Sequence, residues 1–292
     1  MKKVTVRVPA TTANLGPGFD AFGCALSMYT CVSFEPAEKL LITGCEPQYA
    51  GEDNLAYRAY CDALQAMNLP VDGVHIHIDA QIPIGRGLGS SAALLAAGAL
   101  GANLLHGETL TTEQLLAVTT KIEGHPDNLA PALMGGLTAS MMEGEPVAVN
   151  FPLHPDWIFV ALIPDFPLST AFARSVLPQQ LPREDGVYNI SHAALVLKAL
   201  ETGNEALLKL ALQDKVHQPY RKSLITDYDA IAAEVEALGA SMCISGAGPT
   251  LLCLTKNEEV VRALAEKLPA VTTKNWRVVP LKAVAQGAAA CE

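Results

Sequence analysis

The sequence is poor in charged residues, and basic residues in particular are scarce. Charged side chains account for 17% of the 292 residues, and 30 Asp and Glu outnumber 20 Lys and Arg, which gives a formal net charge of −10. No basic cluster is dense enough to neutralise the phosphates of a nucleic acid or of an anionic membrane surface. The composition therefore argues against both as partners. Half of the residues are hydrophobic, which predicts a substantial core and little disorder.

The cysteines lack any pairing pattern. The seven Cys residues are odd in number and include no C-x-x-C motif, and Cys243 and Cys253 fall within apolar, strand-like runs. Free thiols pack in this way as small hydrophobic groups. The pattern is typical of a reduced, cytoplasmic protein.

Long apolar runs are also missing. The longest, residues 92–105, contains internal glycines and falls short of the roughly 20 residues that a membrane span needs. Residues 1–8 alternate like a strand and carry no continuous apolar segment, so we expect no signal peptide. The sequence predicts a soluble protein.

The length of 292 residues suits one large domain or, more readily, two of medium size. The patterning loosens over 144–151 and a new apolar strand begins at 157, which predicts domains of 1–154 and 155–292. In the first domain we expect strands over 4–8, 25–34, 40–44 and 74–79 and helices over 53–67, 92–105 and 111–122. In the second we expect an α+β sandwich of the ferredoxin-like kind, with strands over 157–163, 241–245, 250–255 and 276–282 and helices over 189–202, 204–215, 227–238 and 258–267.

A glycine-rich segment, residues 83–93, joins the strand at 74–79 to the helix that follows. Gly85, Gly87 and Gly89 alternate, so the backbone can adopt torsions closed to other residues and an anion can approach the amides. Two serines stand at the expected N-cap, where free N–H groups and the helix dipole form an anion site. An ordinary capped connection is the plainer interpretation, but the double serine and the small-residue helix favour a phosphate cradle.

This cradle matches neither common phosphate-binding motif. A Walker A loop ends in Gly-Lys-Ser/Thr, and no Lys occurs between Lys39 and Lys121. The dinucleotide fingerprint G-x-G-x-x-G also fails, because its spacing is not met and no acidic residue closes a βαβ unit. Backbone amides and hydroxyls would therefore hold a triphosphate, and a metal ion would have to supply the missing positive charge.

Two turn-rich segments carry polar candidates for a site. Residues 9–20 contain Gly-Pro-Gly at their centre, and Asn14 and Asp20 are their candidates for a site. Residues 123–128, Glu-Gly-His-Pro-Asp-Asn, lie between two apolar elements, and His125 precedes Pro and is therefore expected in a loop. A lone loop histidine is more often structural, but its polar neighbours favour a functional role here.

Two cations and one tight turn stand out in the second half. Arg174 and Arg221 could together hold a carboxylate, although either alone could simply be a solvated surface residue. The turn at 245–250 either reverses the chain or brings backbone close to the phosphate loop, and the sequence does not separate these. His75 and His77 alternate on the polar side of a strand, which favours a solvated face over a metal pair.

Together these segments resemble the GHMP small-molecule kinase superfamily, whose three signatures occur in order at 9–20, 83–93 and 245–250. Within it, Pro-Ala-Thr-Thr-Ala-Asn-Leu-Gly-Pro-Gly-Phe-Asp at 9–20 is similar to homoserine kinases, as are the segments that begin at Glu123 and Thr170. The resemblance spans the whole chain. It implies an α+β, two-domain fold: an N-terminal domain like ribosomal protein S5 domain 2 and a ferredoxin-like C-terminal domain, with ATP bound between them.

The resemblance also implies the nucleotide and metal ligands. Asn54 would lie near the adenine, and Mg²⁺ would be held by Glu123 and by Ser91 or Ser90. The ATP loop would comprise Pro83, Ile84, Gly85, Arg86, Gly87, Leu88, Gly89, Ser90, Ser91, Ala92 and Ala93.

For the second substrate, the resemblance implies L-homoserine, whose side-chain hydroxyl would be phosphorylated on the way to threonine. Asp20 would meet the ammonium group, and Arg174 and Arg221 would meet the carboxylate. The pocket would also contain Asn14, His125 and Asn128. The catalytic candidates are Asn14, Asn128, Thr170 and Arg174.

The resemblance bears on the catalytic base as well. Other superfamily kinases use an Asp near positions 127–128, and the sequence does not decide whether Asp127 or Asn128 faces the site. Phosphoryl transfer through a loose transition state needs little early deprotonation, so we expect transition-state stabilisation without a dedicated base.

Two alternatives and one assembly state accompany this prediction. The chain could be a kinase for a mevalonate- or shikimate-type substrate, but mevalonate has no ammonium and would leave Asp20 unpaired. It could be a non-catalytic GHMP-fold binding protein, although the intact Gly loop and metal ligands argue against this. The resemblance suggests a homodimer.

Overall fold

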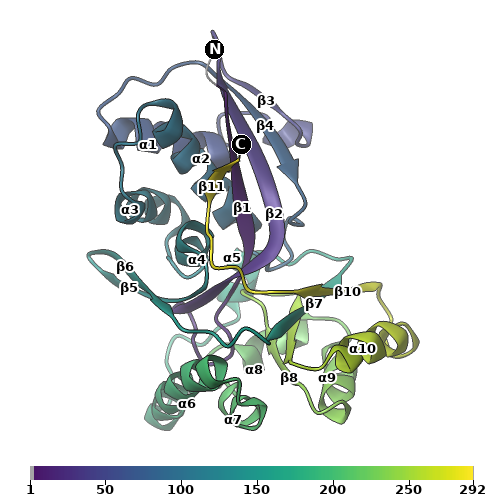
Figure 1. Cartoon of the computed structure of the whole chain (residues 1–292). Helices are drawn as coiled ribbons and strands as arrows, with labels where there is room; N and C mark the ends of the chain where they lie inside the picture. Colours follow the sequence, from purple (N-terminus) through teal and green to yellow (C-terminus); the bar gives the residue numbers. More distant parts are fainter. Residues whose placement is uncertain (1–2, 292) are drawn as a thin grey trace.

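The computed structural model describes residues 3–291, which form two β-sheets with helices packed against them (Figure 1). The first sheet follows the order β11-β1-β2-β4-β3, and a β5–β6 hairpin branches from β2. Its strands are β1 (Val4–Ala13), β2 (Phe22–Pro36), β3 (Leu41–Thr43), β4 (Val74–Ala80), β5 (Leu137–Glu143), β6 (Glu145–Phe151) and β11 (Ala289–Cys291). The helices that lie to one side of it in Figure 1 are α1 (Leu55–Ala66), α2 (Ser90–Leu105), α3 (Thr112–Glu123) and α4 (Leu129–Met134).

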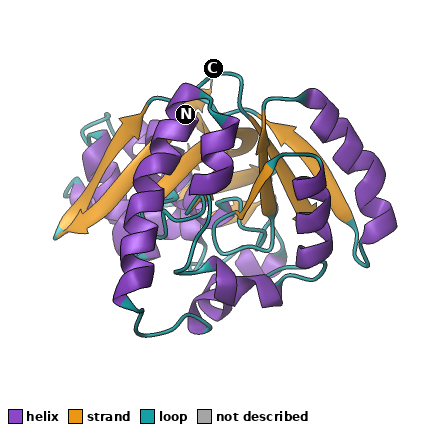
Figure 2. Cartoon of the chain, turned by 90° about the horizontal axis from the view of Figure 1, so that it is seen from below, coloured by secondary structure: helices purple, strands orange, loops and turns teal. Residues whose placement is uncertain are grey.

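The second sheet follows the order β10-β7-β9-β8 and has helices on both faces. Its strands are β7 (Ile158–Pro164), β8 (Ser241–Ile244), β9 (Leu251–Thr255) and β10 (Trp276–Leu281). The helices of this half are α5 (Thr170–Ser175), α6 (Arg183–Thr202), α7 (Glu205–Ala211), α8 (Gln218–Arg221), α9 (Tyr228–Ala237) and α10 (Glu258–Val271). Helices α6 and α7 lie at the lower end of the molecule and stand in front of the strands in the view from below (Figure 2).

Strand β7 explains how this sheet is held between two helical layers. All seven of its residues are buried. Alternate side chains join different cores: Phe159 packs with the core that includes α6 and α7, whereas Val160 packs with that of α9 and α10. A strand covered on both faces reads as a continuous apolar run, as this one does. The strand order β10-β7-β9-β8, with α9 before β8 and α10 between β9 and β10, is the ferredoxin-like arrangement, so the predicted α+β fold is confirmed.

The last described strand returns to the first sheet. β11 pairs antiparallel with β1, with Cys291 opposite Thr5. Figure 1 shows this segment rising from β10 along the edge of the first sheet. The chain passes from the first sheet to the second between β6 and β7. The division into domains of residues 1–154 and 155–292 stays a prediction. Within residues 3–291, no helix combines the length and the apolar character that crossing a membrane would take.

Local sequence signals predicted several element ends correctly. Thr111 and Gln114 form the expected capping box at the start of α3, and Asn257 caps α10. His75 and His77 lie on the polar side of β4, where both rings hydrogen-bond the hydroxyl of Thr43. The alternation that places these histidines opposite the buried residues of β4 is therefore confirmed.

Other element predictions were wrong, for identifiable reasons. β1 does not end before Pro9 but runs to Ala13, because a register shift between Pro9 and Ala10 accommodates the proline. The segment where the pattern loosens is the β5–β6 hairpin, whose outward residues include the exposed Val147 and Val149. Apolar residues on both faces of an edge hairpin remove the alternation on which a strand prediction depends.

Candidate active site

The glycine-rich loop between β4 and α2 is shaped by its neighbours as well as by its torsions. Gly85, Gly87 and Gly89 have φ angles of 65°, 73° and 72°. A Cβ atom at Gly87 would collide with the carbonyl oxygen of Ser245, and one at Gly89 with the hydroxyl of Thr11. The loop is therefore pressed between β1 and the turn that joins β8 to β9, and only glycine fits these positions.

That turn, residues 245–250, both reverses the chain and contacts the loop. Ser245 Oγ donates a hydrogen bond to the carbonyl oxygen of Gly87 over 2.6 Å. The amide of Thr250 donates to the carbonyl oxygen of Arg86 over 3.3 Å. The contact between the two motifs, which the sequence left open, is thus present.

Arg86 is the only basic residue of the loop, and its guanidinium donates hydrogen bonds to backbone carbonyl oxygens. Nε donates to the oxygen of Pro164 over 3.0 Å and Nη2 to that of Asp165 over 2.9 Å, while Nη1 donates to Ile84 within the loop. The side chain braces the loop against the end of β7. Any phosphate here would be held mainly by amides, as the sequence predicted from the absence of lysine.

The start of α2 differs from the prediction in one respect. The N-cap is Gly89, in the left-handed conformation, so Ser90 and Ser91 are the first two helical residues and do not cap the helix. Their hydroxyls are therefore available for other partners. Ser91 Oγ donates to Glu123 Oε2, at the end of α3, over 2.7 Å. A hydroxyl and a carboxylate meet here beside free N–H groups of a helix N-terminus.

The loop over 14–20 is held in an unusual backbone conformation by its own polar groups. Asn14 and Asp20 both have positive φ angles, 72° and 56°. Asn14 Oδ1 accepts the amide of Asp20 over 3.0 Å, and its Nδ2 donates to the carbonyl oxygen of Gly246 over 2.8 Å. Asp20 thereby faces Arg174 on α5, whose Nη1 and Nη2 each lie 2.8 Å from a different carboxylate oxygen. Asp20 and Arg174, which were both expected to contact the substrate, thus form an ion pair with each other.

Arg221, on α8, is almost fully buried, with 1% of its surface exposed. Its Nε donates to the carbonyl oxygen of Ala173 over 3.0 Å, and Nη1 donates to that of Gly246 over 3.3 Å. Burial, and next the positive charge of Arg174, lower the pKa of Arg221 to about 10. The ring of Phe19 lies 5.5 Å from the Arg174 guanidinium and 5.1 Å from that of Arg221. The two cations therefore flank one aromatic ring, as a pair that binds an anion would.

The segment after α3 presents a histidine, a carboxylate and an amide. His125 Nδ1 lies 2.7 Å from Asp127 Oδ1, and this hydrogen bond raises the pKa of the His125 ring against the opposing effect of burial. Asp127 Oδ1 also accepts the amide of Asn128. Asn128 Oδ1 accepts the hydroxyl of Thr11 over 2.8 Å, which leaves its Nδ2 as the group that can donate elsewhere. Oδ1 of Asp127 thus has two partners, whereas Asn128 presents an Nδ2 donor whose orientation is fixed.

Two adjoining cavities collect nearly all of these groups. One, of about 110 Å³, contains charged and polar candidates from both halves of the chain: Asn14, Asp20, Arg86, Ser90, Ser91, Glu123, His125, Asp127, Asn128, Thr170, Arg174 and Arg221. The other, of about 670 Å³, is mostly apolar and shares Gly85, Ser90 and Ser91 with the first.

The second cavity is also lined by Asn54, whose side-chain amide hydrogen-bonds the backbone of neighbouring residues. Asn54 caps α1 through Ala56 and donates to the carbonyl oxygen of Tyr49. Of the predicted loop residues, Leu88, Ala92 and Ala93 are fully buried and Pro83 is partly buried, and none of the four lines either cavity.

Among the residues in or beside the cavities, Thr11, Phe19 and Tyr49 were not sequence candidates. Thr11 orients Asn128, Phe19 lies under the two arginines, and Tyr49 lines the apolar cavity. Thr11 and Phe19 fall within the turn-rich segment already singled out, but a threonine and an aromatic ring there read as ordinary packing. Tyr49 ends a short 3₁₀ turn, which begins at Pro47 and carries no motif.

Comparison with known proteins agrees with this geometry. Models of the GHMP kinases N terminal domain and the GHMP kinases C terminal domain match residues 54–136 and 192–273. The homoserine kinase of Trichodesmium erythraeum is 44% identical, over 94% of this chain and 92% of that protein. That of Clostridium botulinum is 41% identical, over 96% and 95%.

Solved structures agree as well. The crystal structure of homoserine kinase from Cytophaga hutchinsonii aligns with a TM-score of 0.91 at 25% identity and covers 100% of this chain and 98% of that one. A mevalonate kinase of Methanococcus jannaschii, at 15% identity and a TM-score of 0.72, shares the fold alone. With the Gly loop, the paired cavities and near full-length relatives in agreement, this chain belongs to the homoserine kinase family of the GHMP kinases.

Proposed function

We propose that this chain transfers the γ-phosphoryl group of ATP to the side-chain hydroxyl of L-homoserine. The observation that carries the proposal is the small cavity in which Asp20, Arg174 and Arg221 lie beside the glycine-rich loop. One carboxylate and two guanidinium groups complement an amino acid that is a zwitterion. The adjacent apolar cavity offers room for a nucleotide base next to the loop.

The ion pair between Asp20 and Arg174 supports a zwitterionic substrate. A bound amino acid would offer its ammonium to Asp20 and its carboxylate to Arg174 and Arg221. When the ion pair between Asp20 and Arg174 opens, each side chain would then find an opposite charge on the substrate. A substrate that lacks the ammonium group, such as mevalonate, would leave Asp20 uncompensated in a half-buried site.

Ser91 at the start of α2 and Glu123 at the end of α3 are suited to bind Mg²⁺. Ser91 and Glu123 supply a hydroxyl and a carboxylate oxygen that already lie within 2.7 Å of each other, and oxygen ligands beside substrate phosphates suit this ion. Ser91 and Glu123 would hold the ion, with Ser90 next to them. Bound there, Mg²⁺ would supply the positive charge that a loop without lysine lacks.

We propose that catalysis proceeds by positioning and charge stabilisation without a dedicated base. Asn128 presents an amide donor whose orientation Thr11 fixes, and it is suited to hold the reacting oxygen rather than to remove a proton. His125 and Asp127 are paired with each other. Asn14 would orient the substrate loop, and Thr170 and Arg174 would face the transferred group from α5.

The test is ADP release from Mg-ATP with L-homoserine, L-threonine, L-serine, mevalonate and shikimate, each with and without EDTA. Turnover that is strong on L-homoserine and abolished by EDTA is expected. Turnover on mevalonate or shikimate instead would contradict the substrate assignment. ATP binding without turnover on any of them would favour a binding protein.

We further propose a cytoplasmic homodimer. The seven cysteines are all free in the structure, which supports a reducing compartment. The family resemblance supports the dimer. Light scattering coupled to size-exclusion chromatography tests it, and a monomer mass at assay concentrations would contradict it.

A further inference from the structure

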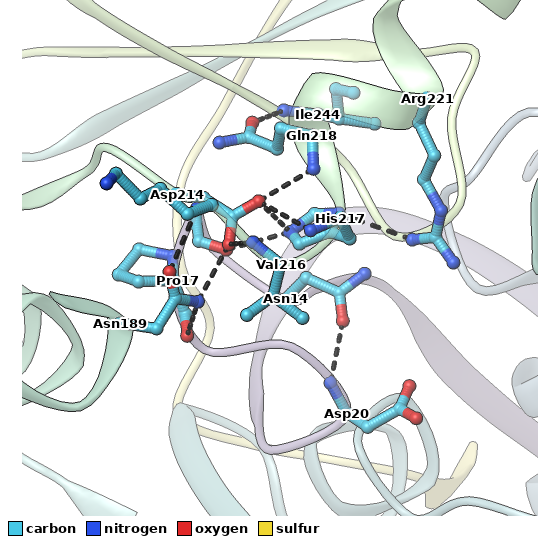
Figure 3. A network of polar contacts seen from close by, with 12 residues as sticks. Asn14, Pro17, Asp20, Asn189, Asp214, Val216, His217, Gln218, Arg221 and Ile244 are labelled. Carbon is cyan, nitrogen blue, oxygen red and sulfur yellow. Dashed lines mark hydrogen bonds and ion pairs between the residues drawn. The ribbon is translucent and has the colours of Figure 1, made fainter. Parts of the chain in front are cut away.

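His217 is a fully buried histidine for which the proposed reaction has so far no use. It lies between α7 and α8 and has 0% of its surface exposed. Its ring contacts three parts of the site. Nδ1 lies 3.4 Å from Nη1 of Arg221 (Figure 3). Nε2 lies 2.8 Å from the carbonyl oxygen of Gly16, and the ring stacks on Phe19 at 5.2 Å. One side chain thus joins the substrate loop to the buried arginine.

The partners of the ring fix its protonation state. A carbonyl oxygen can only accept, so Nε2 must carry the hydrogen that is donated to Gly16. A guanidinium can only donate, so Nδ1 must be bare in order to accept from Arg221. The imidazole is therefore neutral in the Nε2–H tautomer. A second proton on Nδ1 would replace an acceptor with a cation that faces Arg221.

Burial, rather than the balance of charges around it, favours the neutral form of the ring. Burial is the largest influence on the His217 ring and lowers its pKa, and the positive charge of Arg221 acts in the same direction. The carboxylate of Asp214, the hydrogen bond to Gly16 and the carboxylate of Asp20 act against them. Nε2 lies 3.6 Å from Asp214 Oδ2, too far for a hydrogen bond.

Asp214 is committed to the backbone of the same turn. Its oxygens accept the amides of Val216, His217 and Gln218 over 2.6–2.9 Å and the side-chain amide of Asn189 over 2.8 Å (Figure 3). These bonds fix the start of α8, one turn before Arg221. The ring and the arginine are therefore held on one rigid unit, at positions i and i+4 of a helical turn.

We infer that His217 is a positioning residue for L-homoserine: its bare Nδ1 holds the Arg221 guanidinium toward the substrate carboxylate. The inference rests on the proposed function. Without the imidazole, Nη1 of Arg221 keeps only the 3.3 Å contact with Gly246, and Nε keeps Ala173. A planar guanidinium binds a carboxylate well only when its fork is correctly oriented, so binding of the amino acid suffers rather than binding of ATP.

Two substitutions separate the two bonds of the ring. The Oδ1 of asparagine takes the place of Nδ1 and keeps an acceptor for Arg221, whereas the amide nitrogen of glutamine takes the place of Nε2 and keeps the donor to Gly16. Steady-state kinetics on His217→Ala, His217→Asn and His217→Gln would be compared with His77→Asn, a histidine on the exposed side of β4.

Wild-type turnover of L-homoserine is measured first, because its absence would count against the proposed function and not against the role of His217. With that activity present, His217→Ala should lower kcat/KM for L-homoserine by about tenfold or more, the effect of leaving a buried donor unpaired, and leave KM for ATP unchanged. His217→Asn should recover most of this loss and His217→Gln little of it. Recovery by Gln instead of Asn, or an equal effect on both substrates, would overturn the inference.

A spectroscopic readout avoids dependence on activity. Long-range ¹H–¹⁵N spectra of the ring should show the Nε2–H tautomer at neutral pH and no titration above pH 6.5, the ordinary value from which its pKa is lowered. An Nδ1–H tautomer or a protonated ring at neutral pH would also overturn the inference, because Nδ1 could not then accept from Arg221.

Discussion

Replacing Asp20 by asparagine removes one charge from the proposed substrate cavity and little else. In the structure, Asp20 and Arg174 pair through two contacts of 2.8 Å, but their side chains remain 35% and 41% exposed. Solvent screens such a pair, so its loss should cost about 0–1 kcal/mol of folding stability. The fold should therefore tolerate Asp20→Asn.

Substrate recognition should respond far more strongly than stability. A hydrogen bond to a charged group contributes about 1.5–3 kcal/mol, and about 1.4 kcal/mol corresponds to a factor of ten. We therefore expect kcat/KM for L-homoserine to fall roughly ten- to 150-fold in Asp20→Asn, with KM for ATP unchanged. Asp79→Asn, on the exposed side of β4, is the matched control and should behave as wild type.

A substrate without the ammonium group shows whether Asp20 acts through that group. 4-Hydroxybutanoate keeps the carboxylate and the hydroxyl of homoserine, and wild type should use it poorly because Asp20 is left unpaired. If Asp20 binds the ammonium, Asp20→Asn should not weaken turnover of 4-hydroxybutanoate further. An equal loss on both substrates would refute this reasoning, because Asp20 would then act only by orienting Arg174.

Three further predictions concern the metal, the loop and pH. Ser91→Ala should raise the Mg²⁺ concentration for half-maximal turnover by about tenfold or more, whereas Ser91→Thr keeps the hydroxyl and should not; an unchanged Mg²⁺ dependence in the alanine variant would exclude Ser91 as a ligand. Gly89→Ala should lose at least about 1–2 kcal/mol in denaturant unfolding, because φ is 72° and the Cβ meets Thr11, whereas Gly51→Ala, with open space around it, should not. The pKa of His125 is raised by Asp127, so the stability that this hydrogen bond contributes is full below about pH 6.5 and is lost as pH rises through the folded-state pKa. The difference in Tm between wild type and Asp127→Asn should therefore shrink from pH 6 to pH 9. A Tm difference that grows with pH would contradict this prediction.

The parts of the site that depend on short stretches of sequence could be predicted. The glycine loop, the capping box at Thr111 and the polar turn at 123–128 are each specified by residues a few positions apart. Local rules fail at the start of α2, where Gly89 adopts the left-handed torsion and takes the cap position from Ser90. A glycine and a serine are both acceptable caps, and the packing of Thr11 on the loop decides between them.

The parts that depend on contacts between distant segments could not be predicted. Arg174 and Asp20 are 154 positions apart, and nothing in either segment indicates that they pair. No sequence motif singles out His217, because its partners come from residues 16 and 221. Sequence motifs nominate side chains for a site, whereas their hydrogen-bond partners follow only from the tertiary fold.

The pairing of β11 with β1 has a consequence for synthesis of the chain. β1 leaves the ribosome well before its outer neighbour at Ala289–Cys291, which follows about 280 residues later. At about 5–20 residues per second this delay is roughly 15–60 s. During that time β2 can pair with one side of β1, but the other side presents unpaired N–H and C=O groups to any passing strand. The nascent first sheet therefore has an open edge until the segment at Ala289–Cys291 has been synthesised.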